Sequence, residues 1–157
     1  MFGECVLMRG LFIAAALAMN AGLALAGPGP VAGPVAGPVA VDVLSIYDGD
    51  TFTVRARVWP GQYVETAVRV LGVDAPERKG KCAAEIEAAE RAAAFTRAFL
   101  RDGAPIRIAN IKPDKYGGRV DADVLNHAGD SLARSLIAAG LARSYGGKTK
   151  AGWCASN

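Results

Sequence analysis

The sequence predicts an α+β fold that is mainly a β barrel, with five strands and two helices. Two turn signals, Asp48-Gly49 and Pro60-Gly61, separate runs of alternating apolar residues and predict three consecutive strands. A long amphipathic segment then predicts a helix, and two further strands and a second helix follow. We expect strands at about 41–47, 51–58, 63–73, 105–111 and 119–125, and helices at about 83–101 and 130–140. This order is compatible with a small Greek-key barrel of the OB type.

The long helix carries an apolar stripe at helical spacing. The stripe consists of Ala84, Ala88, Ala92, Phe95 and Phe99. We expect this stripe to pack into the core. Glu87 and Arg91 stand four residues apart and are typical of a solvated pair. We therefore assign this helix no chemistry.

The first 26 residues have the pattern of an export signal. Arg9 precedes a short apolar run, and Ala24-Leu25-Ala26 is typical of a cleavage site. The alternative is a retained membrane anchor, for which the run is short and rich in small residues. Residues 27–40 repeat Gly-Pro-Val-Ala and predict an extended, low-complexity linker. We expect a secreted or periplasmic protein with no stable membrane association after cleavage of the signal.

The charge balance is mildly basic. The 157-residue chain carries 18 basic and 15 acidic residues, which gives a net charge of +3. Removal of residues 1–26 takes away one residue of each sign, so the net charge stays +3. Such an excess permits an anionic partner such as nucleic acid without establishing one. Residues 41–157 suffice for one compact domain and are too few for two.

Two cysteines remain once the signal, with Cys5, has been removed. An even pair, Cys82 and Cys154, in an exported protein suggests a disulfide, and two free thiols are the alternative. The bond would join the start of the long helix to the C-terminal tail.

Residues 69–77 place chemistry at the end of a strand. The alternating strand that contains Arg69 leads into Asp74, Ala75, Pro76 and Glu77. Proline cannot donate to a ladder and holds the preceding residue extended, so the strand must stop and present the Ala75 carbonyl outward. A solvated turn with the same residues is the alternative for this segment.

A second acidic cluster lies at Asp48-Gly49-Asp50-Thr51. Turn formation accounts for Asp48 and Gly49, but an aspartate that opens a strand needs exposure or a partner. If Asp50 and Asp74 converge, their carboxylates and the Ala75 carbonyl form an all-oxygen site that suits a hard cation such as Ca²⁺. Zinc is disfavoured, because one histidine and two paired cysteines leave too few nitrogen and sulfur ligands.

The loop before the fifth strand combines two cations with an aromatic ring. Arg119 can donate two parallel hydrogen bonds to a phosphate, Lys115 supplies a point charge, and Tyr116 can bind phosphate or stack on a base. A plain polar hairpin is the alternative reading of this loop.

Four motifs in this order and spacing resemble the staphylococcal nuclease (thermonuclease) family. They are Asp48-Gly49-Asp50-Thr51, Arg69 through Glu77, Asp114 through Arg119, and Asn126 with Ser131-Leu132 and Gly140-Leu141-Ala142. The resemblance covers residues from about 41 to about 145 and implies an OB-fold nuclease domain. It also implies a Ca²⁺-dependent phosphodiesterase activity on DNA, RNA or both.

The resemblance assigns a role to each matching position. Asp50, Asp74 and the Ala75 carbonyl match the ligands of one Ca²⁺ ion, and Asp48 and Thr51 lie beside that ion. The catalytic trio corresponds to Arg69, Glu77 and Arg119. The nucleotide and phosphate contacts correspond to Lys115, Tyr116 and Tyr145. The sequence therefore predicts a secreted nuclease that is expected to be monomeric. A non-catalytic OB-fold module that binds nucleic acid, or a structural envelope interaction module, is the alternative.

Overall fold

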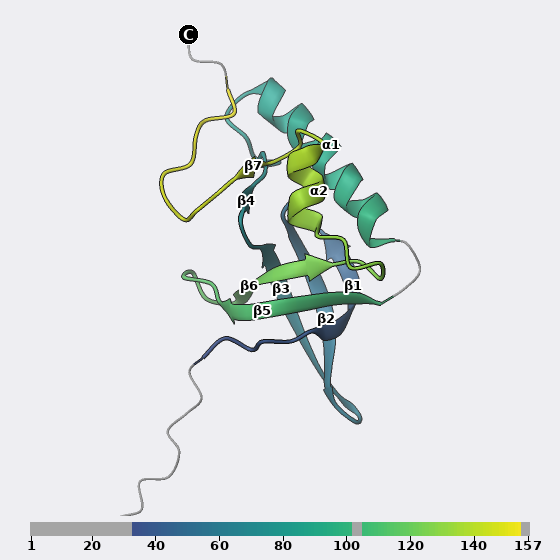
Figure 1. The fold of residues 1–157 in the computed structure, drawn as a ribbon. Helices are drawn as coiled ribbons and strands as arrows, with labels where there is room; N and C mark the ends of the chain where they lie inside the picture. The colour runs from purple at the N-terminus through teal and green to yellow at the C-terminus, as the bar shows by residue number, and fades with distance from the viewer. Residues whose placement is uncertain (1–32, 102–104, 155–157) are drawn as a thin grey trace, which may run out of the picture. The chain divides into compact units, whose positions relative to one another are not determined.

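A computed structural model describes residues 33–101 and 105–154 of the chain. Five strands close into a barrel in the order β1-β2-β3-β6-β5, with β5 pairing back to β1. These strands are β1 (Val39–Ile46), β2 (Thr51–Trp59), β3 (Gln62–Val70), β5 (Ile106–Pro113) and β6 (Arg119–Leu125). The helices are α1 (Ala83–Leu100) and α2 (Leu132–Ala138), and a short ladder joins β4 (Val73–Asp74) to β7 (Arg143–Ser144). The expected five-stranded OB barrel with two helices is confirmed (Figure 1).

One parallel pairing brings the functional motifs to the same part of the barrel. The neighbouring pairs are antiparallel except for β3 with β6, in which Ala67 lies opposite Arg119. On its other side, β3 pairs with β2 so that Arg69 lies opposite Thr51. The sheet register therefore places Thr51, Arg69 and Arg119 on three neighbouring strands.

The core fills the barrel and extends to the two helices, which lie side by side (Figure 1). Alternate residues of the strands point inward, as their period of two requires. Fully buried members include Phe52, Val54, Val68, Val70, Val124, Leu132 and Leu136. Because α2 supplies Leu132 and Leu136 to the same cluster as the strands, helix and barrel share one core.

The buried face of α1 differs from the predicted stripe. Of the predicted members, Ala92 is fully buried, Phe95 and Phe99 are half-buried and Ala84 is exposed. The buried face is instead Glu85, Ala89, Ala92, Ala93, Thr96 and Leu100. Ala92, which belongs to both sets, lies against the turn before β2: a Cβ built on Gly49 would lie 2.6 Å from the Ala92 Cβ. Small residues are needed at this contact, whatever their hydrophobicity.

The sheet begins before the expected domain start. β1 starts at Val39, and Val35 forms an isolated bridge with Ile111, so the last part of the expected linker at 27–40 pairs with β5. The predicted signal at 1–26 lies outside the described residues. Within residues 33–101 and 105–154, no helix is long and apolar enough to cross a membrane.

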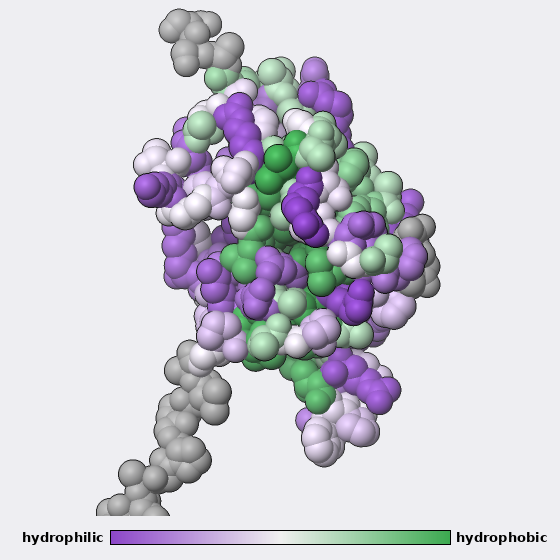
Figure 2. Space-filling model, viewed as in Figure 1, coloured by the Kyte–Doolittle hydropathy of each residue, from purple (hydrophilic) through white to green (hydrophobic). Residues whose placement is uncertain are grey.

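The β2–β3 hairpin projects from the barrel (Figures 1 and 2). Its end exposes Val58, Trp59, Tyr63 and Val64. Closer to the barrel, the Arg55 guanidinium pairs with the Glu65 carboxylate across the two strands at 2.8 Å. Exposed charged pairs of this kind contribute little to stability.

Candidate active site

The motif residues line one pocket of about 260 Å³. The lining consists of Tyr47, Asp48, Thr51, Arg69, Glu77, Lys115, Tyr116, Arg119, Tyr145 and Lys150. Eight of these ten were predicted as site residues from the sequence; Tyr47 and Lys150 were not. The predicted metal ligands Asp50, Asp74 and Ala75 are buried, and Asp50 and Asp74 contact residues of this lining.

Asp50 and Asp74 converge on one guanidinium group. The Arg69 Nη2 lies 3.2 Å from Asp50 Oδ2 and 4.0 Å from Asp74 Oδ1. Asp50 Oδ2 also accepts the Ala75 N–H at 3.2 Å, and Asp50 Oδ1 accepts the Thr51 hydroxyl at 3.0 Å. A buried carboxylate is tolerated only with such partners. The two aspartates that the sequence separates by 24 positions are therefore held together, as the all-oxygen site requires.

Asp48 supports this arrangement from the turn before β2. Its Oδ1 accepts the Asp50 N–H at 3.3 Å, and the residue is 2% exposed. Burial, followed by the charges of Asp50 and Glu77, raises the pKa of Asp48 to about 7. The Gly49 carbonyl in the same turn accepts the Thr96 hydroxyl of α1 at 2.7 Å. The helix to which the sequence assigned no chemistry thus fixes the acidic turn.

Arg119 is held at the rim of the pocket by Asp114. The Arg119 Nε lies 3.0 Å from Asp114 Oδ2, although the contact lacks the geometry of a hydrogen bond. Burial opposes ionisation of Asp114, but the Tyr116 amide and Arg119 outweigh it and hold the pKa of this carboxyl below its ordinary value. The Tyr116 ring lies under both Arg119 and Lys115, at 5.4 Å and 4.7 Å from ring centre to cation. A guanidinium has five donors, so contact at Nε leaves others to bind a ligand.

A family model described as staphylococcal nuclease homologue matches residues 67–152, which is more than half of the chain. The chain belongs to the staphylococcal nuclease homologue family. The match includes Arg69, Asp74, Glu77 and Arg119 and begins after Asp50. No curated protein matches the sequence.

Glu77 of this nuclease homologue forms an ion pair with Lys150, which the sequence analysis did not predict as a site residue. The Lys150 Nζ lies 3.0 Å from Glu77 Oε1 and 2.7 Å from Asp74 Oδ1. Burial opposes protonation of Lys150, but the two carboxylates outweigh it and raise its pKa. Trp153 follows on the same tail and donates its Nε1–H to Asp74 Oδ2 at 3.3 Å.

The expected pairing of the two cysteines could have indicated that the C-terminal tail lies near Glu77. Cys82 and Cys154 form the predicted disulfide, with a Cα–Cα distance of 6.0 Å. Cys82 is five positions after Glu77, and Cys154 is four positions after Lys150. The pairing therefore brings the two segments together. Tyr145 comes directly before the C-terminal tail. Its hydroxyl donates to the Lys148 carbonyl at 2.7 Å, and its side chain lines the pocket.

The donor set of the nuclease homologue fits a cation at Asp50 and Asp74. Among the described residues, two buried side-chain atoms lack a hydrogen-bond partner, Asp74 Oδ1 and Arg119 Nε, and both belong to this site. Asp74 Oδ1 faces the Lys150 ammonium at 2.7 Å. A carboxylate oxygen in this position is an acceptor suited to a positive charge. In the described part of the chain, neither aspartate belongs to a compact cluster of three His, Cys, Asp or Glu side chains, so a cation here would need backbone carbonyl and water ligands as well.

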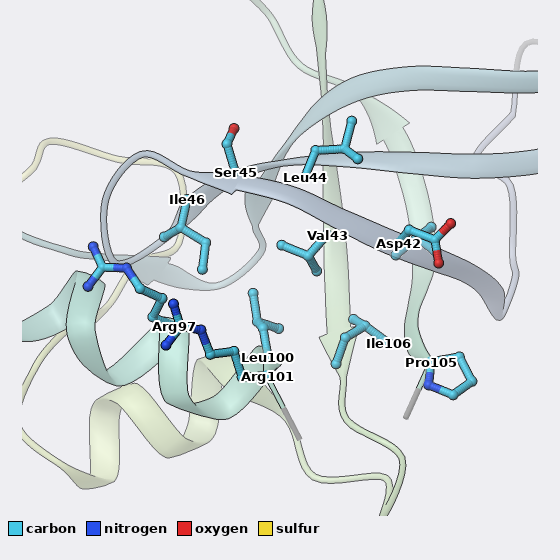
Figure 3. Close-up of a pocket in the computed structure, with 11 residues that line it drawn as sticks. Asp42, Val43, Leu44, Ser45, Ile46, Arg97, Leu100, Arg101, Pro105 and Ile106 are labelled. Atoms are coloured by element: carbon cyan, nitrogen blue, oxygen red, sulfur yellow. The ribbon is translucent and has the colours of Figure 1, made fainter. Parts of the chain in front are cut away.

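Two other features of the described residues are not part of the candidate site. Cys82, Glu85 and Cys154 cluster closely, but both sulfurs are in the disulfide and cannot act as thiolate ligands. A pocket of about 600 Å³ lies between β1 and the end of α1, where Val43, Leu100 and Ile106 point toward one another (Figure 3). Its lining contains a single carboxylate, that of Asp42, so it lacks the paired acids of the candidate site.

Proposed function

We propose that this chain is an exported nuclease that uses one Ca²⁺ ion to hydrolyse phosphodiester bonds in DNA, RNA or both. The observation that supports this most strongly is the pocket lined by Glu77, Arg69 and Arg119 beside the buried carboxylates of Asp50 and Asp74. Guanidinium groups suit phosphate oxygens, and carboxylates suit a hard cation. The family match supports a nuclease-type activity, and the pattern of residues 1–26 supports export.

Asp50, Asp74 and the Ala75 carbonyl would hold the ion, with water in the remaining positions. When bound, Ca²⁺ would polarise a phosphoryl oxygen and neutralise its charge. Asp48 and Thr51 hold Asp50 in place through the hydrogen bonds described above.

The chain's own residues would supply the other steps. The Glu77 carboxylate accepts a proton from the water that attacks in line with the leaving oxygen. Arg69 and Arg119 donate hydrogen bonds to the phosphoryl oxygens as their negative charge increases. Lys115, Tyr116 and Tyr145 line the same pocket and would contact the adjacent phosphate or base.

Replacement of Glu77 by Gln tests this mechanism. The amide cannot accept the proton, so we expect E77Q to lower the rate of DNA or RNA cleavage in Ca²⁺ by about 10²- to 10⁴-fold. Cleavage of single- and double-stranded substrates by purified protein measures the effect. E87Q, at an exposed glutamate on α1, is the control and should keep the wild-type rate.

Two outcomes would contradict the proposal. An unchanged rate in E77Q would remove Glu77 from the reaction. Salt-sensitive oligonucleotide binding without cleavage by the wild-type protein would favour a non-catalytic binding module.

A further inference from the structure

The C-terminal tail, residues 146–154, is fastened beside the candidate active site at three points. Cys154 is bonded to Cys82 at the start of α1. The Arg143 guanidinium lies 3.9 Å from the Trp153 ring centre and donates to the Gly152 carbonyl at 2.9 Å. Trp153 in turn donates to Asp74. The tail is thus a tethered strap of defined position.

The strap carries Lys150 to the carboxylates that the proposed reaction needs. Its ammonium lies between Asp74 and Glu77, at 2.7 Å and 3.0 Å. These are the predicted ligand and the predicted base, so one cation engages both. A Ca²⁺ ion held by the Asp74 carboxylate would be a close neighbour of this ammonium, and the two positive charges would repel each other.

Lys150 has space into which it can move. A pocket of about 380 Å³ between the strap and the start of α1 shares Asp74, Glu77 and Lys150 with the candidate site. Lys150 therefore lines both hollows. Its side chain is 41% exposed, so release to solvent costs little burial.

We propose that Lys150 is a built-in competitor for the catalytic cation, held in place by the disulfide-tethered strap. The inference rests on the proposed function. Cation binding at Asp74 displaces the ammonium and so also frees Glu77 to act as base. The tether keeps Lys150 at a high effective concentration beside the carboxylates, which raises the Ca²⁺ concentration needed to fill the site.

Calorimetric titration of the full oxidised chain with Ca²⁺ tests this without relying on cleavage. We expect K150M to bind Ca²⁺ at least about tenfold more tightly than the wild-type protein. K148M is the matched control, because it removes an exposed charge two positions away on the same strap and should stay within about twofold of wild type. Equal affinities for K150M and K148M would overturn the proposal.

Two further variants separate this inference from the proposed function. D74N should abolish calorimetric binding; if neither the wild-type protein nor K150M binds Ca²⁺ through Asp74, the metal site itself is wrong and the competitor falls with it. If Asp74-dependent binding is present but K150M does not strengthen it, only the competitor role fails. In that case, a loss of cleavage by K150M at saturating Ca²⁺ would assign Lys150 to the substrate phosphate instead.

The tether is tested by the double variant C82A/C154A, with circular dichroism to check its fold. Loss of the bond should strengthen Ca²⁺ binding in the same direction as K150M, and adding K150M to it should have a smaller effect than in the wild-type background. A full, additive K150M effect without the disulfide would show that the bond does not hold Lys150 in place.

Discussion

At the scale of single residues, the site concentrates negative charge in a small buried volume. Asp48, Asp50 and Asp74 are each less than 5% exposed. Arg69 on β3 pairs with Asp50, and Lys150 on the C-terminal tail pairs with Asp74. Asp48 instead meets the charges of Asp50 and Glu77, which is why burial and repulsion together favour its protonated form.

The raised pKa of Asp48 predicts that the stability of the protein depends on pH when a chelator is present. Its pKa is raised from 3.8 to about 7, so between these values the folded state holds a proton that the unfolded state has lost. The resulting stabilisation is fully present below about pH 4 and lost as the pH rises through about 7. Urea unfolding should show the free energy of unfolding falling by up to about 2 kcal/mol from about pH 5 to about pH 7, relative to D48N.

The control for this measurement is D42N, which removes an exposed aspartate on β1. It should keep the wild-type pH profile. A D48N profile parallel to that of the wild-type protein would mean that Asp48 is not protonated in this range.

The site residues that could be predicted from the sequence are those that stand out from their immediate neighbours in the chain. Asp74 and Glu77 flank a proline that ends a strand, and Asp50 opens a strand, where aspartate is unfavourable without a partner. Such conflicts between propensity and position identify functional residues from the sequence. Lys150 has no such conflict, since a lysine in a polar tail is ordinary. Its placement depends on the disulfide and on Arg143 stacking against Trp153, which are tertiary contacts.

At the scale of elements, α1 and the turn before β2 form one supporting unit. Gly49 packs on Ala92, and its carbonyl accepts the Thr96 hydroxyl. Turn signals and periodicity predicted most strand and helix boundaries closely. The expected strand at 63–73 was wrong at its end: β3 stops at Val70, a turn follows, and Val73–Asp74 forms β4, which pairs with β7 instead. The buried face of α1 was not predictable in this way. A buried threonine and a buried glutamate contribute no apolar signal, and the close approach of the turn to Ala92 is a tertiary contact.

Gly49→Ala tests this packing. The new methyl group would lie 2.6 Å from the Ala92 Cβ, so the turn must shift, and we expect a loss of about 1–3 kcal/mol in the free energy of unfolding. The double variant G49A/A92G should be less destabilised than the sum of the single variants, because it removes the atom that clashes. Urea denaturation measures all three.

Gly146→Ala is the matched control for this substitution. Gly146 has open space around its Cβ position and no left-handed backbone, so the change should be close to neutral. Equal stabilities of G49A and G146A would show that the turn does not pack on α1 in solution.

At the scale of the whole molecule, the disulfide connects the strap to the start of α1 across 72 positions. A bond across so long a loop restricts the unfolded chain, which corresponds to roughly 4 kcal/mol in the chain-entropy model. The double variant C82A/C154A should therefore lose on the order of 4 kcal/mol in urea unfolding relative to the oxidised wild-type protein. Unfolding of the wild-type protein with and without reductant provides the comparison, and indistinguishable midpoints would contradict this role of the bond.

In the proposed function, the buried carboxylates, Glu77 and two guanidinium groups act together on a phosphodiester. The most direct test is the single-turnover rate of oligonucleotide cleavage by the oxidised protein across a range of Ca²⁺ concentrations. The rate should rise to saturation with Ca²⁺, be lost in chelator and be strongly lowered by E77Q. A rate that is the same in Ca²⁺ and in chelator, or bound oligonucleotide that stays intact in both, would contradict it.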